Sequence, residues 1–130
     1  MSNINDVIKS WIEKGDHDKN TAELIKEHIP EYRDTIAFQC QQATEKYIKA
    51  WMISRGLEIR KTHDLVYLLE LINEKETVSE IWFDKASALE DFGVEIRYPD
   101  TKIQLSDSDI VEALLIAKEF REFIITKLNL

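Results

Sequence analysis

The chain has 130 residues, a hydrophobic content of 44% and a formal net charge of −8. This length suits one domain, residues 1–130, that buries a hydrophobic core without disulfides or metals. The absence of any run of eighteen apolar residues argues against a membrane span, and the negative charge argues against non-specific binding to duplex nucleic acid, which needs many phosphate contacts from Lys and Arg.

The N-terminal stretch MSNINDVIKSW lacks the basic and then apolar pattern of a signal peptide, so we expect a cytoplasmic protein. The single cysteine, Cys40, rules out an intramolecular disulfide and a cysteine-rich zinc site. Its neighbours Ile36, Ala37 and Ala43 favour a buried core residue over a nucleophile. We expect no metal and no other cofactor.

Three glycines and two prolines are too few for the turns of an all-β fold, and they favour long helices. The first predicted helix runs from about Asn5 to His28, and Pro30 ends it. Gly15 lies on its apolar seam. Because glycine costs about 1 kcal/mol of helix propensity relative to alanine, we expect a close approach of two helices at Gly15.

The second predicted helix covers about residues 31–54 and stops at Gly56, since glycine readily adopts the left-handed cap conformation. Its apolar side consists of Ile36, Cys40, Ala43, Tyr47 and Trp51. Gln42, Glu45 and Lys49 fall on the opposite side, at spacings of three and four. This polar stripe is open to two interpretations, a solvated helix face or one wall of a polar site.

The third predicted helix begins at Thr62 as its N-cap, and its apolar residues are Leu65, Leu68, Leu69 and Ile72. The fourth opens with TVSE, in which Thr77 and Glu80 are expected to form a capping box, and it ends at Gly93. Its expected buried residues are Ile81, Ala88, Leu89 and Phe92.

The fifth predicted helix starts at Ser106, and its inner face comprises Ile110, Ala113, Leu114, Ala117, Phe120 and Ile124. The preceding segment VEIRYPDTKIQL, residues 94–105, is the longest stretch without a helical period. The chain shows no internal repeat and no linker. The sequence therefore predicts one all-α domain, an up-and-down bundle of four to five helices.

Charge is distributed unevenly along the chain. Residues 31–63 hold six basic side chains against four acidic ones, a local balance of +2 in a chain of net charge −8. This middle third is where a phosphate-bearing ligand would be attracted best.

His63 is the histidine with the most suggestive surroundings. It follows Thr62 at the expected helix start and lies beside Arg60 and Lys61. Backbone N–H groups, two cations and an imidazole together suit an anion site. The alternative, equally open, is that Thr62 merely caps the helix and His63 merely contacts the preceding helix.

Other titratable groups give weaker signals. His17 and His28 are interpreted as solvated surface side chains, because neither has partners at metal-ligand spacing. The carboxylate pairs at positions 90–91 and 107–109 are attributed to exposed helix faces and the helix dipole. The sequence contains no glycine-rich phosphate loop, no HExxH and no nucleophile elbow.

Arg97 and Tyr98 stand before Pro99, which disfavours the α conformation at Tyr98 and so displays both side chains in a loop. Loops on a rigid scaffold often carry function. The alternative is a structural turn in which Tyr98 packs on the bundle and Arg97 pairs with Glu95 or Asp100.

The segments FQCQQATEKYIKAWMISRG, KTHDLVYLLELI and IRYPD, in this order, resemble the HEPN family of prokaryotic helical domains. The opening WIEKGDHDKNTA is similar to the first helix of that family, with Trp11, Gly15, Asp18 and Ala22 at the family spacing. The resemblance extends from Trp11 to the last helix.

This resemblance implies a four- or five-helix bundle that commonly forms homodimers and is similar to the C-terminal domain of kanamycin nucleotidyltransferase. Family members are linked to nucleotide or RNA binding. Many are encoded beside a minimal nucleotidyltransferase, which is therefore a candidate protein partner.

A subset of the family are metal-independent ribonucleases, often from toxin–antitoxin pairs, in which four to six residues separate an Arg from a following His. No Arg stands at that spacing before His17, His28 or His63, so the motif is absent and enzymatic activity is not expected. Two alternatives remain: an RNA-cleaving toxin with a non-standard site that uses His63 and Arg97, and a purely protein-interacting regulatory subunit.

The resemblance and the charge of the middle third together predict a non-catalytic domain that binds a nucleotide or nucleic acid. The predicted ligand-binding residues are Gln42, Glu45, Lys49, Lys61, Thr62, His63, Arg97 and Tyr98. Lys49, Lys61 and Arg97 are expected to neutralise phosphate. Gln42 is expected to contact a base or ribose, and Tyr98 to stack.

Overall fold

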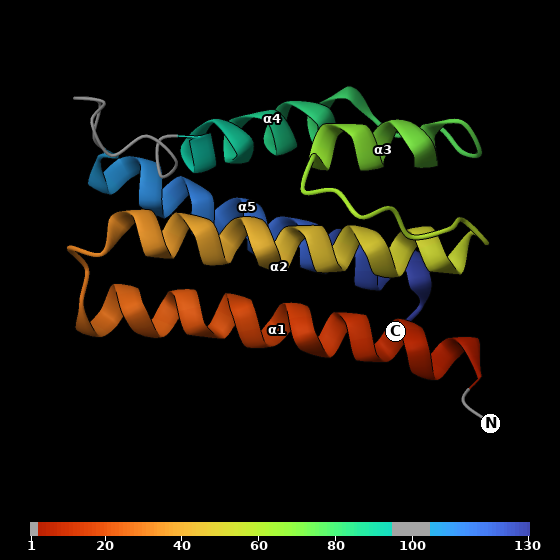
Figure 1. Cartoon of the computed structure of the whole chain (residues 1–130), viewed down its shortest axis with the longest axis horizontal. Helices are drawn as coiled ribbons and strands as arrows, with labels where there is room; N and C mark the ends of the chain where they lie inside the picture. Colours follow the sequence, from red (N-terminus) through yellow and green to blue (C-terminus); the bar gives the residue numbers. More distant parts are fainter. Residues whose placement is uncertain (1–2, 95–104) are drawn as a thin grey trace.

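The structure, a computed structural model, describes residues 3–94 and 105–130, and this part of the chain is helical without any strand. Its helices are α1 (Ile4–His28), α2 (Arg33–Ser54), α3 (Leu65–Asn73), α4 (Glu80–Val94) and α5 (Asp107–Leu128). They pack as a bundle in which the start of α1 and the end of α5 lie at the same end of the molecule (Figure 1). The predicted all-α bundle is confirmed.

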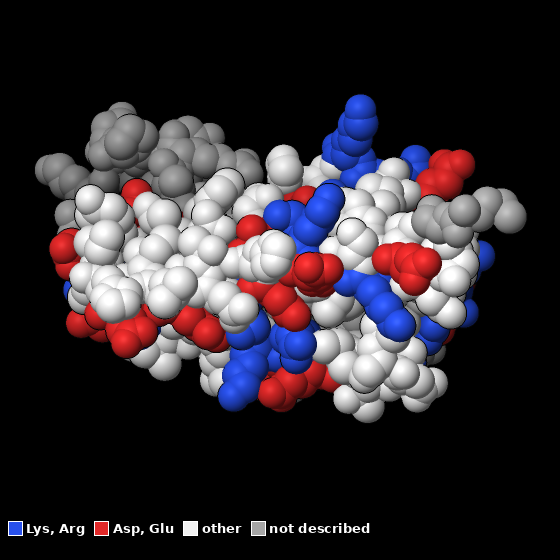
Figure 2. Space-filling view, turned by 90° about the horizontal axis from the view of Figure 1, so that it is seen from below, with Lys and Arg blue, Asp and Glu red and all other residues white. Residues whose placement is uncertain are grey.

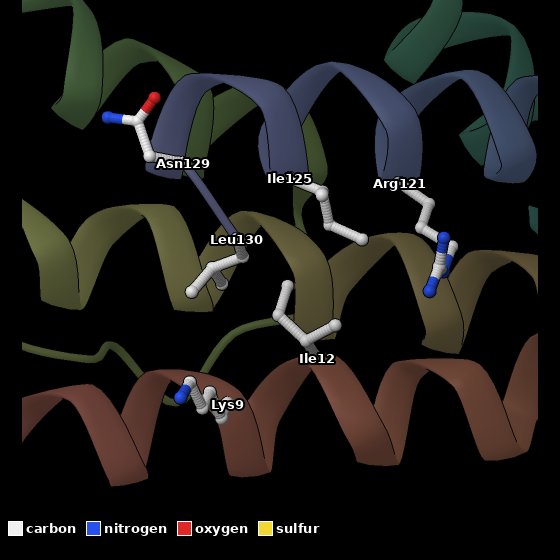
Figure 3. Close-up of a pocket in the computed structure, with 6 residues that line it drawn as sticks. All are labelled: Lys9, Ile12, Arg121, Ile125, Asn129 and Leu130. Carbon is white, nitrogen blue, oxygen red and sulfur yellow. The ribbon is translucent and has the colours of Figure 1, made fainter.

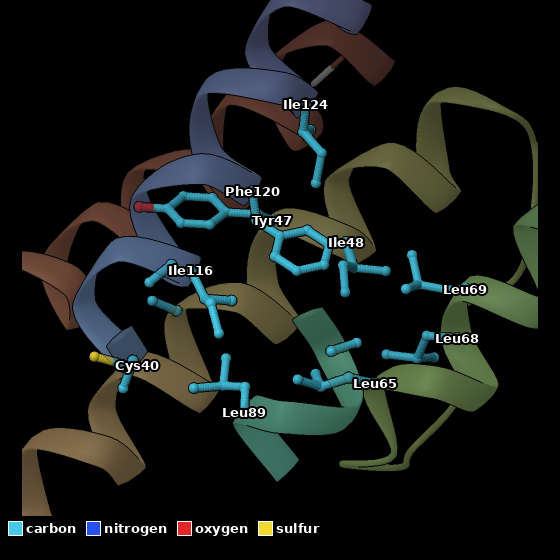
Figure 4. Packing of buried hydrophobic residues seen from close by; sticks show 14 of the residues in the cluster. Cys40, Tyr47, Ile48, Leu65, Leu68, Leu69, Leu89, Ile116, Phe120 and Ile124 are labelled. Carbon is cyan, nitrogen blue, oxygen red and sulfur yellow. The ribbon is translucent and has the colours of Figure 1, made fainter. Parts of the chain in front are cut away.

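Helix α2 is the centre of the bundle, because it contacts α1, α3, α4 and α5. In Figure 1 it lies between α1 on one side and the shorter α3 and α4 on the other. The core around it includes Tyr47, Ile48, Leu65, Leu68, Leu69, Leu89, Ile116, Phe120 and Ile124 (Figure 4). Burial of these apolar side chains supplies the main driving force for folding.

The central position of α2 corrects one interpretation of its sequence. Glu45 and Lys49 were candidates for a solvated helix face, yet their side chains are only 5% and 9% exposed. A helix packed by four neighbours has little solvent-facing surface, so even its polar side is covered. The solvated interpretation is wrong for these two residues, whereas Gln42 is half-buried.

The seam between α1 and α2 behaves as the sequence indicated. Gly15 is buried, and a β-carbon at this position would collide with the ring of Tyr47. The expected close approach at Gly15 is therefore confirmed.

Helix α2 ends before Gly56, whose φ of +73° is the left-handed conformation expected for its cap.

Two predicted helix starts are wrong. Helix α3 begins at Leu65 rather than just after Thr62, and its N-cap is Asp64, whose carboxylate accepts a hydrogen bond from the Tyr67 N–H. Helix α4 begins at Glu80, so the capping box expected from Thr77 does not form. At the start of α3 the Thr62 hydroxyl accepts a hydrogen bond from the Asp64 N–H at 3.1 Å, and Asp64 takes the capping position.

Two further expectations have opposite outcomes. Ile81, expected in the core, is 53% exposed because α4 turns this position to the outside. The start of α5 is as predicted: Ser106 is its N-cap and forms a capping box with Asp109. The segment before it, residues 95–104, lies outside the described residues.

Candidate functional site

His63 is held in place by a buried carboxylate of α2. Its Nδ1 lies 2.8 Å from Oε1 of Glu45. Because a carboxylate accepts but cannot donate, the Nδ1–H donates this bond and Nε2 remains for another partner. The His63 side chain is 64% exposed, whereas that of Glu45 is 5% exposed. The imidazole is thus anchored on one side and open to solvent on the other.

The side-chain contacts that hold His63 extend from Glu45 in α2 to a residue of α1. The second oxygen of Glu45, Oε2, accepts a hydrogen bond of 2.8 Å from Nζ of Lys49, one helical turn further on. Lys49 Nζ in turn lies 5.7 Å from the ring centroid of Trp11 in α1. Each buried charge therefore has a partner, as burial requires. We call His63, Glu45, Lys49 and Trp11 the His63 cluster.

The start of α3, next to His63, donates its N–H groups to oxygens of the protein itself. The Asp64 N–H donates to the Thr62 hydroxyl at 3.1 Å, and the Val66 N–H donates to Oε1 of Glu90 in α4 at 3.1 Å. Burial raises the pKa of Glu90, and the nearby charge of Asp64 raises it further. The helix start is therefore already occupied by carboxylates, and an anion at this place would depend on side chains.

Positive charge in the middle third is concentrated on the loop before α3. Arg60 and Lys61 are exposed, and neither forms a salt bridge within the described residues. Other basic side chains of this region are paired, namely Arg33 with Asp107, Lys46 with Asp18 and Arg55 with Glu76. An incoming phosphate would meet Arg60 and Lys61 first.

The structure thus brings together some of the predicted site residues. Glu45, Lys49 and His63 are in contact, and Lys61 and Thr62 directly precede His63. Gln42 is half-buried one turn ahead of Glu45 on α2, without a side-chain hydrogen bond among the described residues. Arg97 and Tyr98 lie outside the described residues. His17 and His28 are exposed, as expected.

A second polar cluster joins α1, α2 and α5. Asp16 Oδ1 accepts hydrogen bonds of 2.6 Å from both the Tyr47 hydroxyl and Nε of Arg121. Burial alone would raise the pKa of Asp16, but the bonds from Arg121 and Tyr47 outweigh it and hold that pKa below its ordinary value. Burial raises the pKa of Tyr47, and its bond to Asp16 adds to this. Sequence reasoning did not find this cluster, because Asp16 and Arg121 are 105 residues apart.

Arg121 also borders a pocket of about 520 Å³ between α1 and α5. Figure 3 shows Ile12 of α1 and Ile125 of α5 pointing toward one another across it, with Lys9 and Leu130 toward one end and Arg121 toward the other. Two guanidinium nitrogens of Arg121 already bind the carboxylate of Asp16, at 2.6 and 3.1 Å. The charge of Arg121 is therefore largely compensated by Asp16.

A third cluster ties the ends of α2 and α5 to the loop before α4. Glu76 Oε1 accepts hydrogen bonds from Nε1 of Trp51 at 2.7 Å and from Nε of Arg55 at 2.5 Å. Lys127 lies 3.6 Å from the other oxygen of Glu76. Burial would raise the pKa of Glu76, but the Arg55 and Trp51 bonds outweigh it and lower that pKa. The Arg55 side chain is therefore engaged in a structural contact with Glu76.

Charges of both signs are interspersed on the face that α1 forms. Figure 2 shows Lys and Arg side chains beside Asp and Glu side chains there, without a continuous basic surface. Within residues 3–94 and 105–130, no three His, Cys, Asp or Glu side chains gather as a metal site. No helix in the described part of the chain is long and apolar enough to cross a membrane.

A sequence profile of the HEPN domain matches residues 8–128 of this chain. The chain belongs to the HEPN family. No match is found among curated protein sequences.

Two solved structures have a similar fold. The HEPN chain shares 24% identity and a TM-score of 0.77 with the protein TT1696 from Thermus thermophilus, covering 92% of this chain and 97% of that one. It shares 21% identity and a TM-score of 0.73 with ST0689, an archaeal HEPN homologue, covering 92% and 96% of the two chains. At these identities the likeness concerns the fold alone.

The residues that carried the HEPN resemblance in α1 contact α2. Trp11 lies against the ammonium of Lys49, Gly15 lies against the ring of Tyr47, and Asp18 pairs with Lys46. Ala22, the last residue of this pattern, is fully buried. The α1 pattern thus describes one helix–helix seam, and its first member belongs to the His63 cluster.

Proposed function

We propose that this HEPN domain binds the phosphate of a nucleotide or of single-stranded RNA at the loop of Arg60, Lys61 and His63. One observation carries the proposal. A carboxylate that is 5% exposed binds Nδ1 of a histidine that is 64% exposed, which fixes the imidazole with its other nitrogen toward solvent. Two exposed cations precede this histidine in the same loop.

The charges of the His63 cluster suit an anion. A buried Glu45 alone would repel phosphate, but Lys49 lies 2.8 Å away and compensates it. The loop then presents Arg60, Lys61 and, when protonated, His63. A charge-assisted hydrogen bond to phosphate is about twice as strong as a neutral one, so these side chains can hold an anion without the N–H groups of α3.

The structure changes the role that we assign to Lys49. It was expected to neutralise phosphate, but its ammonium is nearly buried between Glu45 and Trp11. We now assign it to supporting the site, and Lys61 and Arg60 to contacting the phosphate. We still predict that Gln42 contacts the base or ribose of the ligand, that Arg97 contacts its phosphate and that Tyr98 stacks on the ligand.

Calorimetric titration with AMP, ATP and a short single-stranded RNA tests the proposal. We expect binding, and we expect the combined Arg60→Ala and Lys61→Ala variant to bind at least about tenfold more weakly, because two charged contacts are lost. Lys118→Ala removes an exposed lysine of α5 and serves as the matched control. Absence of heat with every ligand, or equal affinities of the variants, would overturn it.

RNA cleavage is a second candidate function, and the same contact favours it. A histidine whose Nδ1–H donates to a carboxylate presents Nε2 as a proton acceptor, which is the arrangement of a general base. The expected result is RNA cleavage in the presence of EDTA that the His63→Ala variant loses. Intact RNA with the wild-type protein would contradict this candidate.

The homodimer and the nucleotidyltransferase partner implied by the family stay predictions. Val111 and Leu115, one helical turn apart on α5, are both more than half exposed, which supports a protein contact on this face. Light scattering of the purified protein, alone and with a co-expressed nucleotidyltransferase, tests both. A monomer with and without that partner would contradict them.

A further inference from the structure

We propose that Trp11 is the base-stacking wall of the site and that a nucleobase binds in the pocket beside it. The inference rests on the proposed function, since it names where the base of a phosphate-bound nucleotide would lie. It also gives a role to a residue of α1 that carried the HEPN resemblance.

The pocket lies on one side of α1 near its start. It has a volume of about 300 Å³ and is lined by Asp6, Val7, Ser10, Trp11 and Lys14. This volume is at the lower end of the range for small-molecule sites. Its lining combines one aromatic side chain with a carboxylate, a hydroxyl and an ammonium. A planar ring with polar edges suits this mixture better than an aliphatic chain does.

Trp11 differs from Trp51 in its hydrogen bonding. Nε1 of Trp51 donates to Glu76 at 2.7 Å, whereas Nε1 of Trp11 donates to no acceptor among the described residues. The Trp11 side chain is half-buried and packs against the core, so its orientation is fixed. A fixed, partly exposed indole with an unused donor is suited to stack on a base and to bind its edge.

The pocket is connected to His63 through direct contacts. Lys49 lies over the Trp11 ring and binds Glu45, and Glu45 binds His63. These contacts measure 2.8 Å from His63 Nδ1 to Glu45, 2.8 Å from Glu45 to Lys49 Nζ and 5.7 Å from Lys49 Nζ to the centroid of the Trp11 ring. The phosphate site and the Trp11 pocket are therefore joined by three successive contacts, and the proposal is that one nucleotide extends from the first to the second.

The test uses protein labelled with 5-fluorotryptophan, whose three ¹⁹F signals are assigned with Trp→Phe variants. AMP and a short adenine RNA are expected to shift the Trp11 signal, whereas ribose 5-phosphate, which lacks a base, is expected to bind without shifting it. The Trp51 signal should stay constant, because its indole is buried and bound to Glu76.

Affinities of the Trp11→Leu variant complete the experiment. Loss of stacking should weaken AMP binding about 5- to 100-fold. Binding of ribose 5-phosphate should weaken by a clearly smaller factor, because Trp11 also lies against Lys49 of the His63 cluster, and circular dichroism confirms that the variant is folded. AMP binding without a Trp11 shift, or with unchanged affinity in Trp11→Leu, would overturn the role of Trp11 and leave the phosphate site standing. Absence of binding by all three ligands would overturn both proposals.

Discussion

The ring of Tyr47 lies where a β-carbon on Gly15 would stand, with Cε1 only 2.5 Å from that position. Tyr47 cannot easily move aside, because it is fully buried and its hydroxyl binds Asp16 at 2.6 Å. This close approach sets the separation of α1 and α2 at the seam that also holds Trp11 against Lys49.

The Gly15→Ala variant should therefore be less stable, although alanine is the better helix former by about 1 kcal/mol. Overpacking of a core costs about 1–3 kcal/mol. We expect this cost to exceed the gain in helix propensity and to lower the free energy of unfolding measured in urea. In a Tyr47→Leu background the same substitution should cost less. An increase in stability in the wild-type background would show that the helices separate without penalty.

The Asp16→Asn variant should lose about 1–3 kcal/mol at neutral pH, because two charge-assisted contacts to Arg121 are weakened. The folded pKa of Asp16 is lowered, so its contribution is complete above its unfolded pKa and is lost as the pH falls through the lower folded pKa. Urea titrations at pH 7 and near pH 3 should show the two proteins converging in acid. A difference independent of pH would contradict this account.

Glu90 is expected to respond to pH in the opposite direction. Its folded pKa is raised by burial and by Asp64, so the stability linked to its protonated form is complete below the unfolded pKa and is lost as the pH rises through the folded pKa. Glu90→Gln keeps an acceptor for the Val66 N–H without the charge. Its free energy of unfolding should equal or exceed that of the wild type at pH 7, and it should lose this advantage near pH 4.

The matched control for this prediction is Glu90→Ala. It removes the acceptor altogether and leaves the Val66 N–H without its partner, which should cost about 1–3 kcal/mol at both pH values. If Glu90→Gln destabilises as much as Glu90→Ala at pH 7, the charge of Glu90 is favourable in the folded protein and the inferred direction is wrong.

Cys40 should be unreactive toward thiol reagents in the folded protein. Its side chain is fully buried, and burial, with a smaller contribution from the charge of Glu23, raises its pKa to about 12. At pH 8 we expect no labelling by Ellman's reagent in native buffer and one equivalent of labelling in concentrated urea. Rapid labelling of the native protein would show that α2 opens locally.

Periodic apolar residues were sufficient to predict the helices, but not the environment of α2. The sequence of α2 shows one apolar and one polar side, which is typical of a helix with one face in solvent. Its central position depends on how α3, α4 and α5 pack around it, and a single helix does not reveal this. Buried Glu45 and Lys49 followed from the topology, and so could not be predicted from spacing.

The sequence predicted only part of the candidate site, for a similar reason. Contacts within a helix, such as Glu45 with Lys49, follow from spacing, and the contact of His63 with Glu45 matches one of the two open alternatives for His63. Trp11 entered the sequence analysis only through the family spacing that it shares with Gly15, Asp18 and Ala22. Its pocket depends on the three-dimensional surface of α1, which the sequence pattern does not describe.

The central claim is that Arg60, Lys61 and His63 bind phosphate. It is tested most directly by titrating ¹⁵N-labelled protein with AMP and following the backbone amides and the histidine ring nitrogens by NMR. We predict saturable shifts of the amides of Arg60 and Lys61 and of Nε2 of His63, with the amide of Lys118 in α5 unchanged. Saturable binding that leaves the three site signals unmoved, or no saturable shift anywhere, would contradict the claim.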